Sequence, residues 1–369
     1  MNKVFLICEK PNAAKKIANA LAENKVKEVE SEYGAKYYVF KRNGIEHLAV
    51  PAVGHIFTLK DVSKKGWVYP VLDTDWAPTF EVNKSAEFAR KYFKTFESLV
   101  KDNYEYVIAT DLDEEGSVIG YNILRFICKK RDAKRMCFST LTKLDLIKAY
   151  ENVLKHIDKG RIESGLTRHE LDFLYGINTS RALTLSIKAG GKKLSHYILS
   201  AGRVQTPMLY FLIKREKEIK KFKPKPFWQI EAKVKTKPQI TCLHKKGKFW
   251  SKDEVDKIIK NCKNKNAIVK KITSRKRQQL PPYPFDLTSL QTEAYKFFGY
   301  SPKRTISIAQ NLYTAGYISY PRTSSQKLPK QLGYKNILKA LQKLKGYKEL
   351  SAKLLSKTNL VPREGPKSD

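Results

Sequence analysis

Tyr320 and Arg322 have the residue types and the spacing needed for attack on a phosphate. Tyr320 precedes Pro321, and the residue before a proline is restricted to extended backbone, which predicts an exposed and stiffly held phenol. In an extended segment the side chain of Arg322 projects to the same face. A guanidinium can hold two phosphoryl oxygens while a tyrosine oxygen acts as the nucleophile. The chain has 20 tyrosines, so this motif alone leaves a structural role for Tyr320 open.

Three carboxylates follow a predicted strand. Residues 104–110 are typical of a buried strand, and Asp111, Asp113 and Glu115 come directly after it, before a helix predicted for Ser117–Cys128. Asp111 and Asp113 point the same way in an extended segment, and Glu115 joins them as the chain turns. Such carboxylates repel one another unless a hard cation lies among them, and Mg²⁺ prefers oxygen ligands. An acidic loop that caps the helix is the alternative interpretation.

Another carboxylate lies at the end of the first predicted strand. Lys3–Cys8 is typical of a buried strand, Glu9 and Lys10 follow it, and a helical pattern covers Ala13–Ala22. Ligands bind in α/β proteins where a strand leads into a helix N-terminus, so Glu9 is a catalytic candidate. An acid that complements the helix dipole is the alternative. His55 is expected to be a packed loop histidine.

The charge of the chain indicates a polyanionic partner. Its 369 residues include 72 Lys and Arg against 36 Asp and Glu, a net charge of +36, which favours nucleic acid or an anionic membrane surface. No apolar run approaches the roughly 20 residues of a membrane span, so nucleic acid is favoured. The five cysteines form no Cys-x-x-Cys pair, which favours a reducing cytoplasm and argues against a zinc ribbon. No Walker phosphate loop is present, so ATP use is not indicated.

The remaining patterns predict the elements that position these residues. Two strands flanking Asn43-Gly44 predict a hairpin. Phe211–Leu280 has 23 Lys and Arg against six acids, a surplus of 23 − 6 = +17, and indicates a small basic β-rich domain. Further predicted strands and helices cover Lys36–Phe40, Glu46–Val50, Arg135–Ser139, Leu141–Ile157, Phe227–Val234, Ala267–Thr273, Ser289–Phe298 and Pro302–Ala315. Gly316 is expected to end the last of these helices, before a short β-prone piece that carries Tyr320.

Two polar segments are candidates for contact with a phosphodiester strand. Arg168 and Asp172 form an i, i+4 pair at helical spacing, which is typical of a solvated or interhelical salt bridge. Small residues precede Arg203 and Gln205 in Ser200–Pro207, a composition that allows the backbone to approach a nucleic acid closely.

Four motifs together resemble the type IA DNA topoisomerases, most closely the archaeal members. They are Glu9-Lys10-Pro11, Asp111-x-Asp113-x-Glu115-Gly116, Ser200-Ala201-Gly202-Arg203-Val204-Gln205 and Tyr320-x-Arg322-Thr323, in the family's order and separations. The resemblance implies an α/β Toprim domain with a mostly parallel sheet, followed by α-helical and small β-rich parts of a toroidal clamp. The expected domains are a Toprim metal-binding domain at 1–150, the first part of a helical DNA-binding domain at 151–210, a basic β-rich clamp part at 211–280, and a helical gate domain at 281–369.

The resemblance also implies roles for these residues. Tyr320 would form a 5′-phosphotyrosine, Arg322 and Lys10 would lie at the phosphate, and Glu9 would pass a proton to the leaving 3′ oxygen. The residues implied to hold Mg²⁺ are Asp111, Asp113, Glu115 and Glu9, and those implied to contact single-stranded DNA are Arg168, Asp172, Arg203 and Gln205.

The implied function is ATP-independent, Mg²⁺-assisted relaxation of negatively supercoiled DNA by a cytoplasmic, nucleoid-associated enzyme. Compared with the family, the sequence has Glu114 and Ser117 around the acidic motif and Ser324 in place of an acid after Thr323. Members of the family continue beyond the position of residue 369 into a histidine motif and the return half of the clamp. The sequence leaves open whether the chain is a fragment, is self-sufficient or is completed by a second polypeptide. The alternatives are a Toprim nuclease or primase-like enzyme, the topoisomerase half of a reverse gyrase, and a non-catalytic basic DNA-binding module.

Overall fold

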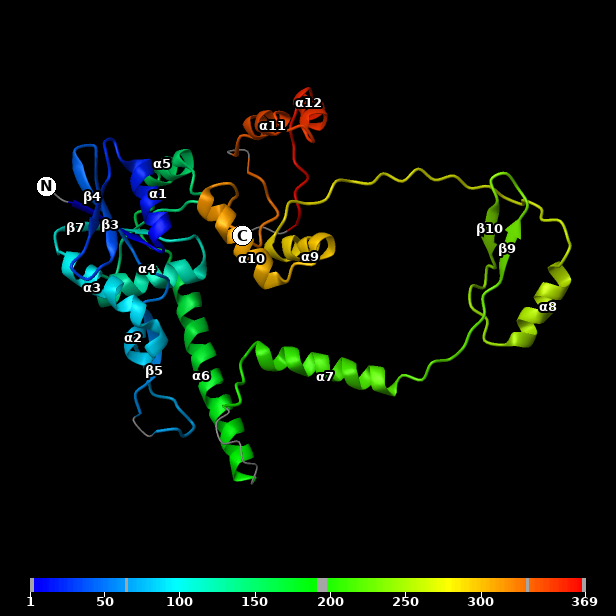
Figure 1. Cartoon of the computed structure of the whole chain (residues 1–369), viewed down its shortest axis with the longest axis horizontal. Helices are drawn as coiled ribbons and strands as arrows, with labels where there is room; N and C mark the ends of the chain where they lie inside the picture. Colours follow the sequence, from blue (N-terminus) through cyan, green and yellow to red (C-terminus); the bar gives the residue numbers. More distant parts are fainter. Residues whose placement is uncertain (1–2, 64–65, 191–197, 330–331, 367–369) are drawn as a thin grey trace. The chain divides into compact units, whose positions relative to one another are not determined.

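The computed structural model describes residues 3–63, 66–190, 198–329 and 332–366 (Figure 1). These residues form two compact units, one made of residues 1–203 together with 281–369 and the other of residues 204–280. The four-domain division with borders at residues 150, 210 and 280 stays a prediction.

The first unit is built on a six-stranded sheet in the order β2-β3-β4-β1-β7-β8. Strand β1 lies between β4 and β7 and runs parallel to both, β8 is parallel to β7, and β2, β3 and β4 pair antiparallel. The predicted α/β fold with a mostly parallel sheet is therefore confirmed. The strands are β1 (Lys3–Cys8), β2 (Lys27–Glu30), β3 (Lys36–Arg42), β4 (Ile45–Pro51), β7 (Tyr104–Ala109) and β8 (Lys134–Arg135).

Helices cover both faces of this sheet (Figure 1). Successive side chains of a strand point to opposite faces, so Val4, Leu6 and Cys8 of β1 pack with helices α1 and α5. Phe5 and Ile7 pack on the other face with α3 and α4. The four helices are α1 (Pro11–Leu21), α3 (Arg90–Leu99), α4 (Glu114–Phe126) and α5 (Lys143–Glu151).

The other elements of the first unit lie around this α/β core. Strands β5 (Phe57–Asp61) and β6 (Thr74–Pro78) form an antiparallel pair. Ala309 and Tyr313 of helix α10 are buried, and Tyr313 belongs to the core cluster that contains α1. The remaining elements are α2 (Thr79–Val82), the 3-10 helix η1 (Lys84–Ala89), α6 (Lys159–Ala189), α9 (Leu287–Phe298), α10 (Pro302–Ala315), α11 (Tyr334–Gln342) and α12 (Lys348–Leu355).

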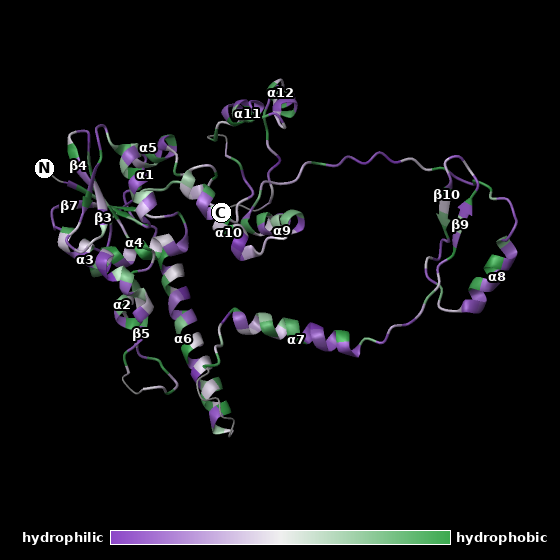
Figure 2. Cartoon of the chain, in the orientation of Figure 1, coloured by the Kyte–Doolittle hydropathy of each residue, from purple (hydrophilic) through white to green (hydrophobic). Residues whose placement is uncertain are grey.

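The second unit has few buried side chains. Its elements are α7 (Gln205–Lys221), β9 (Glu231–Val234), β10 (Ile240–Leu243) and α8 (Lys252–Cys262), with β9 and β10 paired antiparallel. Figure 2 shows the mainly hydrophobic first half of α7 followed by a mainly hydrophilic second half, and no residue of this helix is buried. Among the described residues of this unit, the buried hydrophobic side chains are Phe249 and Val255.

Several predicted elements differ from the structure. The strand expected at Ala267–Thr273 is wrong, because these residues have no regular secondary structure and their apolar side chains are exposed. An alternating pattern stabilises a strand only where one face packs against a partner. The strand expected at Arg135–Ser139 is reduced to the two residues of β8, and the helix expected to reach Ile157 ends at Glu151.

The predicted turn at Asn43-Gly44 and the predicted helix end at Gly316 agree with the structure. Arg42 pairs with Ile45, so Asn43 and Gly44 form the two-residue turn between β3 and β4. Gly316 ends α10 with a φ of 87°, a left-handed conformation that a residue without Cβ adopts at little cost. Among the described residues, no helix combines the length and the apolar composition needed to cross a membrane.

Candidate active site

The ends of two neighbouring parallel strands bring Glu9 and Asp111 together. Glu9 follows β1 and Asp111 lies two residues after the last residue of β7, and the two strands are in register, with Cys8 opposite Ala109. The amide of Asp111 donates a hydrogen bond to Glu9 Oε2 at 3.3 Å. Both carboxylates are buried, with 8% of Glu9 and 3% of Asp111 exposed. The sheet therefore places two acids in a poorly hydrated position at one edge.

Lys10 lies between these two carboxylates. Its Nζ is 2.7 Å from Glu9 Oε1 and 3.3 Å from Asp111 Oδ2. Burial and the nearby Asp111 charge raise the pKa of Glu9, although Lys10 opposes this change. Burial lowers the pKa of Lys10, but the charges of Glu9 and Asp111 outweigh this effect and leave that pKa above its usual value. Lys10 therefore bridges the two buried carboxylates.

Asp113 caps helix α4 and also binds Tyr320. Its Oδ1 accepts a hydrogen bond from the amide of Gly116 at 2.7 Å, and its Oδ2 accepts one from the hydroxyl of Tyr320 at 2.5 Å. This turn requires a glycine, because a Cβ on Gly116 would lie 2.3 Å from the backbone oxygen of Asp111. The predicted nucleophile and one of the predicted metal ligands are thus in direct contact, although 207 residues separate them in the sequence.

Tyr320 is partly buried, which corrects the expectation of an exposed phenol on a strand. Its amide donates to the carbonyl of Ser139 at 2.8 Å, and its ring packs edge-on against Tyr313, with centroids 5.3 Å apart. The segment around it forms no strand, because this backbone bond does not extend into a ladder. Burial and the hydrogen bond to Asp113 raise the pKa of Tyr320, so its hydroxyl is protonated at neutral pH.

Two residues of this cluster were missed by the sequence analysis. Buried Tyr313 on α10 donates its hydroxyl to Asp111 Oδ1 at 2.9 Å. Buried Arg135 donates to the carbonyls of Asp111 at 2.8 Å and of Thr110 at 2.9 Å, and so fixes the backbone that carries Asp111. Neither residue lies in a recognisable motif, and only the apolar helical pattern around Tyr313 indicated that it would be buried.

The donor set of this cluster fits a hard divalent cation. Each carboxylate oxygen of Glu9, Asp111 and Asp113 already accepts a hydrogen bond or an ion pair, from Lys10, Tyr313, Tyr320 or a backbone amide. A carboxylate oxygen has further lone pairs, and several such oxygens at one place are the ligands that Mg²⁺ prefers. The cavity bounded by Glu9, Asp111 and Tyr313 has a volume of about 10 Å³, the space of a single water molecule.

Glu115 makes other contacts. Its Oε2 is 2.7 Å from His55 Nε2 and 3.0 Å from His169 Nε2, and its Oε1 is 3.7 Å from Arg168. Hydrogen bonds from the two imidazoles lower its pKa. Among the described residues, Glu115 shares no hydrogen-bond donor or cation with Asp111 or Asp113.

The predicted DNA-contacting residues of the first unit form an ion-pair network. Arg203 binds both carboxylate oxygens of Asp172, at 2.6 and 3.1 Å, while Arg168 lies 3.9 Å from the same carboxylate. The stronger partner of Asp172 is therefore Arg203, and not Arg168 as its i, i+4 spacing indicated. Gln205 is exposed at the first position of α7 in the other unit. Arg322 is exposed and has no hydrogen bond or ion pair with a described residue.

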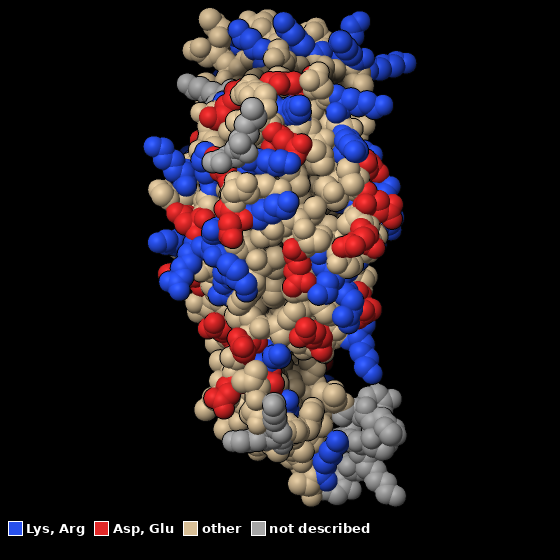
Figure 3. Space-filling model, turned by 90° about the vertical axis from the view of Figure 1, so that its left-hand side faces the viewer, with Lys and Arg blue, Asp and Glu red and all other residues tan. Residues whose placement is uncertain are grey.

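The surface around the Toprim-like sheet has charges of both signs. Figure 3 shows Lys and Arg side chains lying among Asp and Glu side chains on this face. Ion pairs in this part of the chain include Lys130 with Asp102 and Lys134 with Glu105. This face therefore forms no uniform basic field.

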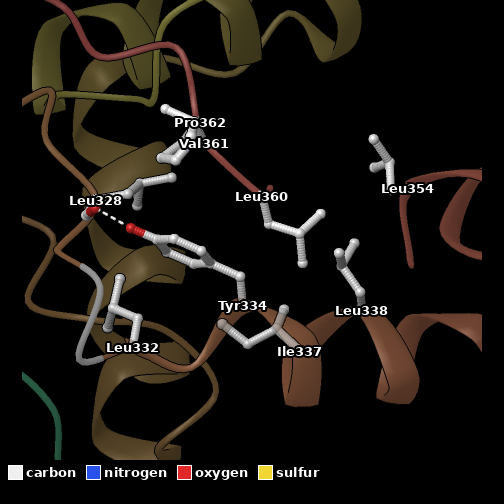
Figure 4. Close-up of a pocket in the computed structure, with 9 residues that line it drawn as sticks. All are labelled: Leu328, Leu332, Tyr334, Ile337, Leu338, Leu354, Leu360, Val361 and Pro362. Atoms are coloured by element: carbon white, nitrogen blue, oxygen red, sulfur yellow. Dashed lines mark hydrogen bonds between the residues drawn. The ribbon is translucent and has the colours of Figure 1, made fainter. Parts of the chain in front are cut away.

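A separate apolar pocket of about 350 Å³ lies next to helices α11 and α12 (Figure 4). The hydroxyl of Tyr334 points toward Leu328 and donates a hydrogen bond to its carbonyl. The lining contains no acid or base that could take part in catalysis, and it consists of Leu328, Leu332, Tyr334, Ile337, Leu338, Leu354, Leu360, Val361 and Pro362.

Comparisons with known proteins match both parts of the chain. A family model described as DNA topoisomerase matches residues 156–368, and a Toprim domain model matches residues 4–141. The chain is 46% identical over 368 residues to DNA topoisomerase 1 of Methanocaldococcus jannaschii, covering 99% of this chain and 47% of that protein. It is 42% identical over 370 residues to DNA topoisomerase 1 of Pyrococcus horikoshii, covering 99% of this chain and 53% of that protein.

A solved structure also resembles this chain. Full-length topoisomerase I from Thermotoga maritima aligns with a TM-score of 0.62 and 25% identity, over 93% of this chain and 53% of that one. The chain thus spans about half the length of the relatives that it matches.

Proposed function

Because the chain belongs to the type IA DNA topoisomerase family, we propose that it cleaves one DNA strand by attack of Tyr320 on a phosphodiester. The tyrosine oxygen forms a bond to phosphorus, the bond to the 3′ oxygen breaks, and a 5′-phosphotyrosine and a free 3′ hydroxyl result. The contact between the Tyr320 hydroxyl and Asp113 Oδ2 carries this proposal, because it holds a phenol against buried carboxylates.

The neighbouring residues suit the proton transfers of this reaction. Asp113 accepts the hydrogen bond from the Tyr320 hydroxyl and can take its proton as the oxygen attacks. Glu9 lies beside Asp111 and Lys10 in the same cluster and is the proposed donor of a proton to the leaving 3′ oxygen. Arg322 is exposed and can pair with the phosphate through its planar guanidinium, and Lys10 is the second cation near the acids.

Mg²⁺ fits the oxygen donors of Asp111 and Asp113, with Glu9 as a further proposed ligand. Glu115, the fourth residue that the resemblance implies as a ligand, contacts His55 and His169 instead. When bound, it supplies positive charge that offsets the charge of the phosphate. Religation reverses the same transesterification, in which the phosphotyrosine bond replaces the phosphodiester bond, so the reaction needs no ATP.

The proposed substrates are single-stranded and negatively supercoiled DNA, which a chain of net charge +36 attracts. Location in the cytoplasm at the nucleoid follows from this choice of partner. Strand passage is a separate proposal, because the matches cover 47% to 53% of the relatives. Plasmid relaxation by the chain, with and without a polypeptide corresponding to the rest of the relatives, tests this proposal.

The cleavage proposal is tested with a single-stranded oligonucleotide labelled at its 3′ end. Denaturation of the reaction should leave label on the protein, because a 5′-phosphotyrosine retains the downstream fragment. Tyr320→Phe should abolish the adduct, whereas Tyr317→Phe, a matched change at a side chain that is 80% exposed, should keep it. Strand cleavage that persists in Tyr320→Phe would instead support a Toprim nuclease, and binding without cleavage in the unchanged chain would support a DNA-binding module.

A further inference from the structure

Two imidazoles and a carboxylate converge outside the Tyr320 cluster. One ligand atom from each of His55, Glu115 and His169 lies within 4.8 Å of the others. The closest contacts are 2.7 Å from His55 Nε2 to Glu115 Oε2 and 3.0 Å from His169 Nε2 to the same oxygen. Atoms that bind one first-row metal ion lie about 2.0–2.2 Å from it, and therefore about 3 Å from one another. The distances from the two imidazole nitrogens to Glu115 Oε2 are close to this spacing, and all three ligand atoms lie within 4.8 Å of one another.

Three separate elements hold these side chains in place. His55 lies between β4 and β5, where its carbonyl accepts a hydrogen bond from Thr79. Glu115 lies in the first turn of α4. His169 lies on α6, and its ring is 5.8 Å from that of Trp76 and 4.8 Å from that of His55. The side chains are 28–30% exposed, so an ion can reach them from solvent.

We propose that His55, Glu115 and His169 bind a divalent transition-metal ion, of which Zn²⁺ is the best fit. Two imidazole nitrogens and one carboxylate oxygen form a common zinc ligand set, with water in the remaining position. The Asp111 and Asp113 cluster offers oxygen donors and suits Mg²⁺, so the two sites differ in the metal that they select.

The nearby charges permit a cation at this place. Arg168 is 3.7 Å from Glu115, but it approaches Oε1, whereas the imidazoles face Oε2. The Arg168 side chain also lies 3.7 Å from Glu114 and 3.9 Å from Asp172, and these two acids offset its charge. A bound ion would join the region matched as Toprim to helix α6 of the region matched as topoisomerase. The inference does not depend on the proposed cleavage by Tyr320.

The test is a calorimetric titration of the full chain with Zn²⁺ after removal of metals by a chelator, in excess Mg²⁺. We expect one site per chain, with affinity at least tenfold weaker in His169→Ala and in His55→Ala. His156→Ala is the matched control, because His156 pairs with Asp132 at 2.6 Å but belongs to no such cluster among the residues that the structure describes. Affinity should not change in this variant. Equal binding by the unchanged chain and both site variants, or no binding above that expected for cysteines, would overturn the proposal.

Two further measurements separate this site from the cysteines and from misfolding. Alkylation of the thiols should leave Zn²⁺ binding intact, and Co²⁺ in its place should give visible bands without thiolate charge transfer. Circular dichroism and the glutamine variant His169→Gln, which keeps a polar side chain, show whether lost binding reflects lost fold. Binding that disappears on alkylation would assign the metal to cysteine and contradict the proposal.

Discussion

The carboxylate cluster at the ends of β1 and β7 and the basic unit of residues 204–280 use charge in opposite ways. In the cluster, Glu9 and Asp111 are buried and each oxygen has a defined donor. In the basic unit, few side chains are buried, and the 23 cations of residues 211–280 face solvent with six acids to pair with. Packing therefore holds the charged groups of the cluster, where the reaction is proposed, in defined positions. The exposed cations of the basic unit instead form a diffuse positive field, which suits a phosphate backbone.

Asp111→Asn is expected to have the largest effect and to act on catalysis alone. Loss of one charge from the cluster should lower cleavage and religation by roughly 100-fold, as removal of a preorganised electrostatic contact does. DNA affinity should change by less than about twofold, because phosphate contacts dominate it. Single-turnover gels and fluorescence anisotropy measure the two quantities. Asp102→Asn, at a side chain 98% exposed near the other end of β7, should change neither. A matching fall in affinity would remove the distinction between the two regions.

Arg135→Ala should show how much the buried contacts next to Asp111 stabilise the fold. The substitution removes hydrogen bonds to the carbonyls of Thr110 and Asp111 and leaves a cavity, which should lower the unfolding free energy by about 3 kcal/mol. Arg215→Ala changes a side chain that is 75% exposed in α7 and should cost less than about 0.5 kcal/mol. Urea unfolding compares them, and equal losses would contradict this reasoning.

Substitution of Lys270, Lys271, Arg275, Lys276 and Arg277 by glutamine should weaken DNA binding and flatten its dependence on salt. Each lost phosphate contact should reduce the slope of log K against log salt by about 0.7 for a single strand. These residues lie in an exposed segment without regular secondary structure, so the fold should be unchanged. Glutamines at Lys129, Lys130 and Arg131 of the first unit form the control. If the control lowers the slope as much, the basic unit has no special part in binding.

Substitution of His47 should give the smallest effect, a change in how the stability of the first unit depends on pH. Burial lowers the pKa of His47, outweighing the opposing hydrogen bond to the carbonyl of Ile45. The unfolded chain therefore binds this proton more readily, and stability should fall as pH falls through the ordinary histidine range near about 6.5. Urea unfolding between pH 8 and 5 should show a shallower loss in His47→Gln. His244→Gln, at an exposed histidine of the basic unit, should leave the slope as it was.

The sequence predicted what local patterns determine. Apolar runs located β1 and β7, and the acids that follow each strand meet because parallel strands end at the same edge. The sequence did not predict contacts between segments that are far apart in the chain. The pairing of Tyr320 with Asp113, and of Glu115 with His55 and His169, depends on how helices pack on the sheet. The roles of Tyr320, Glu9, Arg322 and the other site residues stay predictions until the variants are measured.

The Tyr320–Asp113 contact depends on whether the tyrosine oxygen carries a hydrogen or is bonded to phosphorus. The hydroxyl hydrogen that Tyr320 gives to Asp113 no longer exists once the oxygen is esterified to phosphorus. A phosphodiester oxygen next to this carboxylate would bring two negative charges together and repel it. The proposed cleavage would thereby remove a contact between residue 320 and the N-cap of α4, and the proposed religation would restore it. In the proposed reaction, the Tyr320–Asp113 hydrogen bond can therefore form only while the tyrosine oxygen is not bonded to DNA.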